Sequence, residues 1–160
     1  MQKRLERGFS LIELLIVVAI IGIIAAIAVP NLLKSQQAAR ETAAMQELKT
    51  IQSVQVLYSV TKGHRKFADL ATLGSNALID SALASGSKGG YIFTATPIDG
   101  EGMPQMLYDA AAKPSAVGTF GTGNRSYYTN ETNVVYEADG GNPPTATVQD
   151  RVPKDGQPIQ

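Results

Sequence analysis

The fold of this 160-residue chain is decided by the stretch Phe9-Ser10-Leu11-Ile12-Glu13-Leu14-Leu15-Ile16-Val17-Val18-Ala19-Ile20-Ile21-Gly22-Ile23-Ile24-Ala25-Ala26-Ile27-Ala28-Val29. It carries one charge, Glu13, at the edge of an apolar run from Leu14 to Val29. As a helix rising ~1.5 Å per residue it reaches roughly 30 Å, the thickness of a bilayer core. We therefore expect residues 9–30 to form a membrane-length helix. A carboxylate in such a helix is energetically costly, which predicts a function for Glu13.

Residues 1–8 precede this helix and carry three basic residues against one acidic residue, Glu6. The excess of positive charge predicts that the N-terminus stays in the cytoplasm and the rest lies outside. A secretory signal peptide is the alternative, with a small-residue cleavage site at Ala26-Ile27-Ala28. The length of the apolar stretch, the position of Glu13 and the helix-forming sequence beyond Ala28 favour a segment that is retained.

The motif Gly8-Phe9-Ser10-Leu11-Ile12-Glu13-Leu14, the apolar run through Gly22 and the ending Ala28-Val29-Pro30 closely resemble the class III signal of type IV prepilins and type II secretion pseudopilins, most of all a type IVa-type pilin. The resemblance implies that prepilin peptidase cuts after Gly8, removes residues 1–8 as a leader, and methylates the amino group of Phe9. It also implies that Glu13 of one subunit pairs with the Phe9 amino group of its neighbour. Because an unpaired charge in an apolar filament core is unfavourable, this pair would disfavour subunits that are out of register.

Residues 31–63 are expected to continue the helix in amphipathic form, with apolar residues mostly three or four apart. Pro30 lacks a backbone N–H and its ring crowds the carbonyl of Ala26, which predicts a kink or an opened turn near residues 26–30, with Gly22 as a second weak point. A gentle kink in a continuous helix is the alternative for an isolated subunit. Gly63 is the predicted C-cap.

Residues 64–138 are expected to form a globular head, and residues 139–160 a flexible tail because they are rich in glycine, proline and polar residues. The predicted short helices are 69–73 and 77–84, and the predicted strands are 90–97, 106–112, 125–129 and 134–138. The fold class is α+β: one long N-terminal helix packed on a small antiparallel sheet in a pilin-like roll. We expect the core to hold Leu48, Ile51, Val54, Leu57 and Tyr58 from the helix, and mostly to hold Tyr91, Phe93, Tyr108, Phe120, Tyr127, Tyr128 and Tyr136 from the head.

Composition limits the possible functions. The chain has 14 basic and 14 acidic residues; without the leader, 11 basic stand against 13 acidic residues, which argues against specific nucleic-acid binding. It has no cysteine, whereas many type IV pilins close a C-terminal loop with a cysteine pair, so packing, hydrogen bonds or ions must secure this C-terminus. No catalytic constellation is evident, and we expect neither an enzyme nor a cofactor. The spacing of Asp139, Asp150 and Asp155 matches no compact calcium loop, so no metal site is predicted.

Taken together, these features predict a structural subunit of a type IV pilus-like filament, located in the bacterial inner membrane before assembly and then in a periplasmic or surface filament. The partners implied by the resemblance are other copies of the chain, minor pilins, prepilin peptidase, an assembly ATPase with its platform protein, and a secretin. A type II secretion pseudopilin is the main alternative. An exported or membrane-tethered soluble binding domain is an alternative of a different class. Charged residues on the second half of the helix, such as Lys34, Arg40, Glu41 and Glu47, are interpreted as solvated rather than as specific subunit contacts.

Overall fold

The computed structural model describes residues 8–98 and 107–159, which divide into a part up to Ser35 and a part from Gln36 onward. We call the second part the head. The helices are α1 (Leu11–Thr61), α2 (Leu70–Ser75) and α3 (Ser81–Ala84). The strands are β1 (Ser87–Lys88), β2 (Tyr91–Ile98), β3 (Leu107–Pro114), β4 (Arg125–Asn130), β5 (Val135–Asp139) and β6 (Gln157–Pro158). The predicted α+β class is confirmed. Residues 1–7 of the predicted leader and Met106 of the second predicted strand lie outside the described residues.

Helix α1 runs without interruption through Gly22 and Pro30, so the structure has a continuous helix and not an opened turn at residues 26–30. At its C-terminal end, Gly63 donates its N–H to the carbonyl of Tyr58 at 2.7 Å. A Cβ at Gly63 would lie 2.3 Å from the Lys66 carbonyl oxygen, so this position needs glycine for space. The left-handed backbone that usually ends a helix falls instead on His64 and Arg65, with φ of 47° and 73°.

The two short helices each begin at an aspartate that caps the first turn. Asp69 accepts a hydrogen bond from the Thr72 N–H at 2.8 Å, and Asp80 accepts from the N–H groups of Ala82 and Leu83 at 3.0 Å. The first predicted helix is thus confirmed within two residues, whereas only the second half of the predicted segment 77–84 is helical. A positive φ of 56° at Ala77 is incompatible with a helix starting there.

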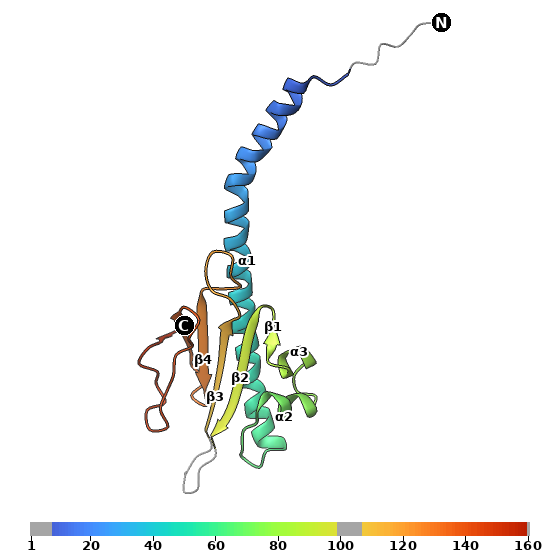
Figure 1. The fold of residues 1–160 in the computed structure, drawn as a ribbon. Helices are drawn as coiled ribbons and strands as arrows, with labels where there is room; N and C mark the ends of the chain where they lie inside the picture. Colours follow the sequence, from blue (N-terminus) through green and yellow to red (C-terminus); the bar gives the residue numbers. More distant parts are fainter. Residues whose placement is uncertain (1–7, 99–106, 160) are drawn as a thin grey trace, which may run out of the picture. The chain divides into compact units, whose positions relative to one another are not determined.

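The six strands form one antiparallel sheet in which each strand pairs with its neighbour in sequence, in the order β1 to β6 (Figure 1). The four predicted strands are present with ends shifted by one or two residues. Pro97 does not end β2, since it pairs with Tyr108 and the strand continues to Ile98. The two-residue strands β1 and β6 at the edges were not predicted, because two residues show no alternation of polar and apolar side chains.

The core of the head lies between the sheet and the part of α1 that follows Gln36. Leu48 and Ile51 are fully buried there, together with Ala44 and with Tyr91, Phe93, Tyr108 and Tyr127 from the sheet. Leu57, predicted to join them, is 48% exposed. It lies nine residues after Leu48, or two and a half helical turns, and therefore on the opposite side of α1. Val54 and Tyr58 are only partly buried.

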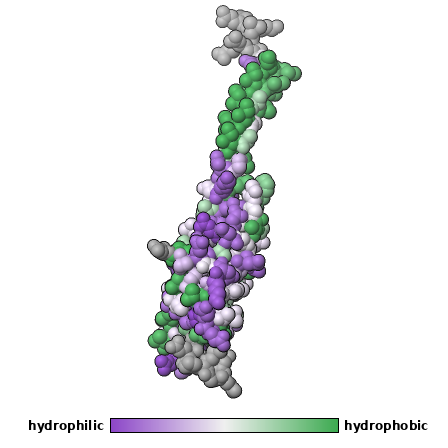
Figure 2. Space-filling model, turned by 90° about the vertical axis from the view of Figure 1, so that its left-hand side faces the viewer, coloured by the Kyte–Doolittle hydropathy of each residue, from purple (hydrophilic) through white to green (hydrophobic). Residues whose placement is uncertain are grey.

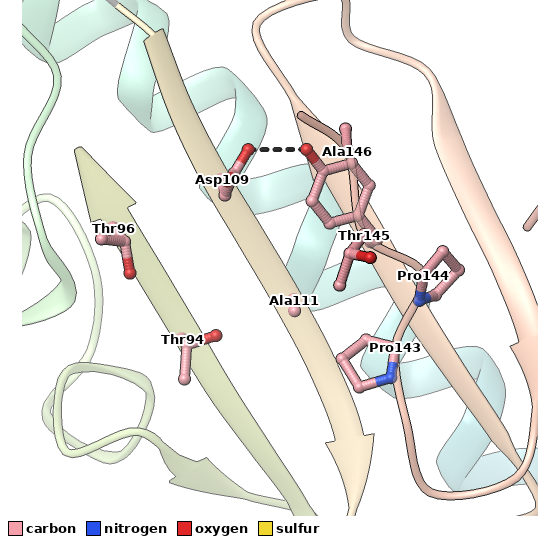
Figure 3. A pocket seen from close by; sticks show the side chains of 9 residues that line it. Thr94, Thr96, Asp109, Ala111, Pro143, Pro144, Thr145 and Ala146 are labelled. Atoms are coloured by element: carbon pink, nitrogen blue, oxygen red, sulfur yellow. Dashed lines mark hydrogen bonds between the residues drawn. The ribbon is translucent and has the colours of Figure 1, made fainter. Parts of the chain in front are cut away.

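The segment after β5, predicted to be a flexible tail, packs on the second face of the sheet. Adjacent residues of a strand point to opposite faces, so Tyr127 enters the core while Tyr128 lies under this segment. Figure 3 shows Pro143, Pro144 and Thr145 beside Thr94 and Ala111 of the sheet, around a small pocket of about 220 Å³. The dashed line marks the Tyr128 hydroxyl donating to Asp109 at 2.6 Å.

Candidate assembly site

The start of α1 contains the glutamate half of a capping box. Glu13 is the third residue after Ser10, and its Oε2 accepts a hydrogen bond from the Ser10 N–H at 3.0 Å. Reaching back in this way, a glutamate satisfies a backbone donor that the first turn of a helix leaves without a partner. Glu13 is exposed, so its carboxylate is also available to a cation from outside the subunit. The Ser-x-x-Glu spacing of residues 10–13 is the sequence signal for this hydrogen bond.

The apolar side chains that follow Glu13 have no cover within the described chain. Every large apolar side chain from Phe9 to Val29 is exposed, from 47% for Val17 to 83% for Phe9. Figure 2 shows, on the face in view, a hydrophobic surface along the N-terminal part of α1. By length and composition this part of the helix is able to cross a membrane. Because an exposed apolar surface of this extent is unfavourable in water, it requires lipid or other helices around it.

Gly22 and Pro30 lie inside this segment. A Cβ at Gly22 would meet no atom within 4 Å, so packing within the subunit does not demand glycine there. Pro30 lies within α1 and leaves the carbonyl of Ala26 without its usual helical donor. Both positions thus weaken the helix locally.

In the head, glutamine side chains of α1 form hydrogen bonds to other parts of the chain. Gln55 is fully buried, and its side-chain amide makes two hydrogen bonds to the backbone of Ala68, donating to the carbonyl at 2.6 Å and accepting from the N–H at 2.9 Å. Gln52 donates to the Thr129 hydroxyl of β4. These residues were missed in the sequence because glutamine at a helix position indicates exposure unless its partner is known.

Two of the helix carboxylates interpreted as solvated are instead held within the head. Glu41 accepts the backbone N–H of Asn124 at 2.7 Å. Glu47 pairs with Lys88 of β1 at 2.5 Å, and Lys88 also pairs with Asp80 at 2.7 Å. Hydrogen bonds to these two carboxylates raise the pKa of Lys88. The charges therefore secure the edge strand β1 to α1 and α3.

Two of the three aspartates considered as calcium ligands, Asp150 and Asp155, accept backbone hydrogen bonds in the C-terminal segment. Asp150 accepts the Val152 N–H at 3.2 Å, and Asp155 accepts the Thr145 N–H at 3.1 Å. Among residues 8–98 and 107–159, no group of three or more His, Cys, Asp or Glu side chains is arranged to hold a metal ion. Their observed role is to shape the turns of the segment.

The N-terminal segment and much of the head are similar to known proteins. Residues 3–29 match the family model described as the prokaryotic N-terminal methylation motif. The chain is 32% identical over 113 residues to type II secretion system core protein G of Aeromonas hydrophila, which covers 67% of this chain and 76% of that protein. The chain belongs to the family of type IV pilins and type II secretion pseudopilins. The pilin motif contains Gly8, Phe9, Glu13 and Gly22, and ends one residue before Pro30.

Other members of the pilin family are similar over shorter ranges. Identity to the type IV major pilin protein PilA of Myxococcus xanthus is 46% over 66 residues, which is 41% of this chain and 29% of that pilin. Identity to the type IV wide pilus major component PilA4 of Thermus thermophilus is 33% over 97 residues, which is 58% of this chain and 74% of that protein. The chain thus spans less than a third of the Myxococcus pilin but about three quarters of the other two relatives. No solved structure matches it.

Proposed function

We propose that the chain is the structural subunit of a type IV pilus-like filament, inserted in the inner membrane with its N-terminus in the cytoplasm and its head outside. Prepilin peptidase cuts after Gly8 and methylates the new amino group of Phe9. The subunit then leaves the membrane and assembles with other copies, and the assembly ATPase, its platform protein, minor pilins and a secretin act as partners. The single observation that carries this proposal is the fully exposed apolar segment of α1 behind a prepilin motif.

Glu13 is proposed to set the axial register of assembly. Cleavage after Gly8 creates a cation on Phe9, four residues before Glu13, and methylation preserves its charge. The carboxylate already accepts the Ser10 N–H at 3.0 Å, which holds it beside the start of α1 where a neighbour's amino group is expected to dock. In the apolar core formed by bundled helices, either charge without its partner is strongly unfavourable. Gly22 and Pro30 are proposed as the places where α1 stretches when helices bundle.

A structural role without catalysis fits the names of the relatives, which are pilins and secretion core proteins. A pseudopilin of a type II secretion system is the second candidate, supported by the similarity to protein G over 67% of this chain. Pseudopilins share the processing of pilins and differ in building a short periplasmic filament. We rank the pilus first because a 66-residue segment of the chain is 46% identical to a major pilin.

Two measurements test the proposal. Mass spectrometry of the mature protein is expected to find an N-terminus at methylated Phe9. A chain that starts at Val29 would identify a secreted domain and would contradict filament assembly. Electron microscopy with peptide identification is expected to find the chain in long surface filaments. If the chain starts at methylated Phe9 but occurs only in short periplasmic filaments, the pseudopilin is the correct assignment.

A further inference from the structure

The loop between β3 and β4 presents an aromatic side chain to solvent. Phe120 is 86% exposed, the highest value among the large apolar side chains of the described part of the head, and Val117 of the same loop is 51% exposed. Phe120 was predicted to lie in the core with the other aromatic residues, and this prediction is wrong. Burial of a phenylalanine side chain is favourable, so Phe120, together with a second exposed apolar residue of the same loop, is a candidate contact for another molecule.

The loop is held rigidly beneath this side chain. Gln37 of α1 is buried, and its side-chain amide donates to the carbonyl oxygens of Gly118 at 2.7 Å, Gly121 at 3.1 Å and Thr119 at 3.3 Å. The loop end is held by the hydrogen bond from the Asn124 N–H to Glu41. A side chain presented on a braced loop loses little conformational freedom on binding, which favours a specific contact.

The opposite end of the head carries a second exposed apolar patch. Val56, Leu57 and Val60 of α1 are 46%, 48% and 80% exposed. Val60 lies four residues after Val56 and three after Leu57, so the three side chains lie on one side of the helix. Val60 follows Gln37, the anchor of the Phe120 loop, by 23 residues, or roughly 35 Å along α1. Figure 1 shows the β3–β4 loop and the end of α1 at opposite ends of the sheet.

We propose that Phe120 of one subunit packs on the Val56–Val60 patch of a second copy of this chain. A helical filament is built from head-to-tail contacts in which two different surfaces of the same chain meet. The exposed Phe120 side chain at one end of the head and the Val56–Val60 patch at the other end are two such surfaces, separated along the direction of α1. An aromatic side chain surrounded by small apolar contacts is typical of the residues that dominate an interface. The inference rests on the proposed filament function and names the head contact within it.

Cysteine cross-linking tests this contact directly. The chain has no cysteine, so the double variant F120C/V60C in the full-length protein contains only the two introduced thiols. Mild oxidation of purified filaments is expected to give a ladder of covalent multimers, because each subunit is linked to the next. The single variants F120C and V60C are expected to give no ladder. F120C/V152C is the matched control, because Val152 is also exposed, at 55%, and lies outside both surfaces.

The outcomes separate this contact from the function on which it rests. If the unmodified chain forms no filaments, the proposed function and the contact both fall. If F120C/V60C filaments form and give no ladder, only the contact is overturned. The contact is also overturned if F120C alone gives dimers or links to another protein. If this pair does not assemble, T119C/T61C places the thiols one residue away, and assembled filaments without a ladder again contradict the contact. Phe120→Ala is expected to lower filament yield at least about tenfold, and Phe120→Leu to retain most of it.

Discussion

The guanidinium of Arg151 and the carboxylate of Glu131 face each other across two hydrogen bonds. Nε lies 2.6 Å from Oε1, and one terminal nitrogen lies 2.8 Å from Oε2. The same nitrogen donates to the Tyr108 carbonyl and to Asp109, each at 2.8 Å. Since Asn130 donates to the Arg151 carbonyl at 2.7 Å, the residue is held through its side chain and its backbone. This cluster attaches the C-terminal segment to the sheet in a chain that has no cysteine for a disulfide.

Arg151→Ala is expected to destabilise the head by about 3 kcal/mol. The Arg151 side chain is only 13% exposed and that of Glu131 only 17%, so the substitution leaves a carboxylate largely buried without its partner. Urea unfolding of the full-length chain in detergent, followed by tyrosine fluorescence, measures the loss. Lys154→Ala is the matched control, because Lys154 is an exposed cation of the same segment, and we expect a change below about 0.5 kcal/mol. Equal effects of the two substitutions would contradict a specific role for the cluster.

The same pair predicts a loss of stability in acid. Burial by itself raises the pKa of Glu131, but hydrogen bonding and charge attraction from Arg151 outweigh burial, and the pKa is lowered from its ordinary value of 4.5. A carboxyl group with a lowered pKa in the folded state stabilises that state above its ordinary pKa, and this contribution is lost as the pH falls through the lowered value. Unfolding free energies are therefore expected to decrease below pH 4.5, and less steeply in Arg151→Ala. Parallel pH profiles of the two proteins would contradict this.

The sequence predicted the parts of the molecule whose pattern is local. The apolar run from Leu14 to Val29 and the alternation of strands such as β2 are readable within a few residues. The polar contacts of the head could not be predicted, because their partners are remote in sequence. Gln37 binds carbonyl groups more than eighty residues away, and Arg151 binds Asp109 of β3, 42 residues away. At the C-terminus, few apolar residues predicted a flexible tail, whereas the hydrogen bonds of the largely buried Arg151 side chain attach this segment to the sheet.

The buried side of α1 explains why some of its residues were misplaced. Its members are three, four or seven residues apart and include Gln37, Ala44, Leu48, Ile51 and Gln55. The first and last of these are polar, so the apolar pattern alone suggested a stripe that runs from Leu48 to Tyr58. Glutamine belongs on the buried side here because a backbone segment of the head lies against it and needs hydrogen-bond partners.

Gln55→Leu is expected to destabilise the head by about 2 kcal/mol. The substitution keeps an apolar stem of similar size but leaves the N–H and the carbonyl of Ala68 buried without the partners they have now. Gln46→Leu, at an exposed position of the same helix, is the control and is expected to change stability little. The measurement is the same urea unfolding experiment. A neutral Gln55→Leu variant would show that water replaces the amide at this site.

Tyr108→Phe is expected to stabilise the head by about 1 kcal/mol. The Tyr108 ring packs against Phe67 with centroids 4.6 Å apart, and its buried hydroxyl has no hydrogen-bond partner in the part of the chain that the structure describes. Removing a buried polar atom without a partner removes its desolvation cost. Tyr91→Phe is the matched comparison with the opposite sign, because the Tyr91 hydroxyl donates to the Arg125 carbonyl at 2.9 Å. Shifts of the same sign in thermal unfolding would contradict this assignment.

Glu13→Gln separates the two roles assigned to this carboxylate. Glutamine retains an oxygen that can accept the Ser10 N–H, so the helix start is preserved, but it carries no charge to pair with the Phe9 amino group of a neighbour. We expect the variant to be cut after Gly8 as usual and to yield at least about tenfold fewer filaments, because an unpaired ammonium in the apolar core is disfavoured. Sheared filaments are compared with the membrane pool by immunoblot, and the mature N-terminus by mass spectrometry. Glu13→Ala, which removes the cap as well, is expected to lose filaments at least as severely. If Glu13→Gln assembles normally while Glu13→Ala does not, the cap alone matters and the register hypothesis is wrong.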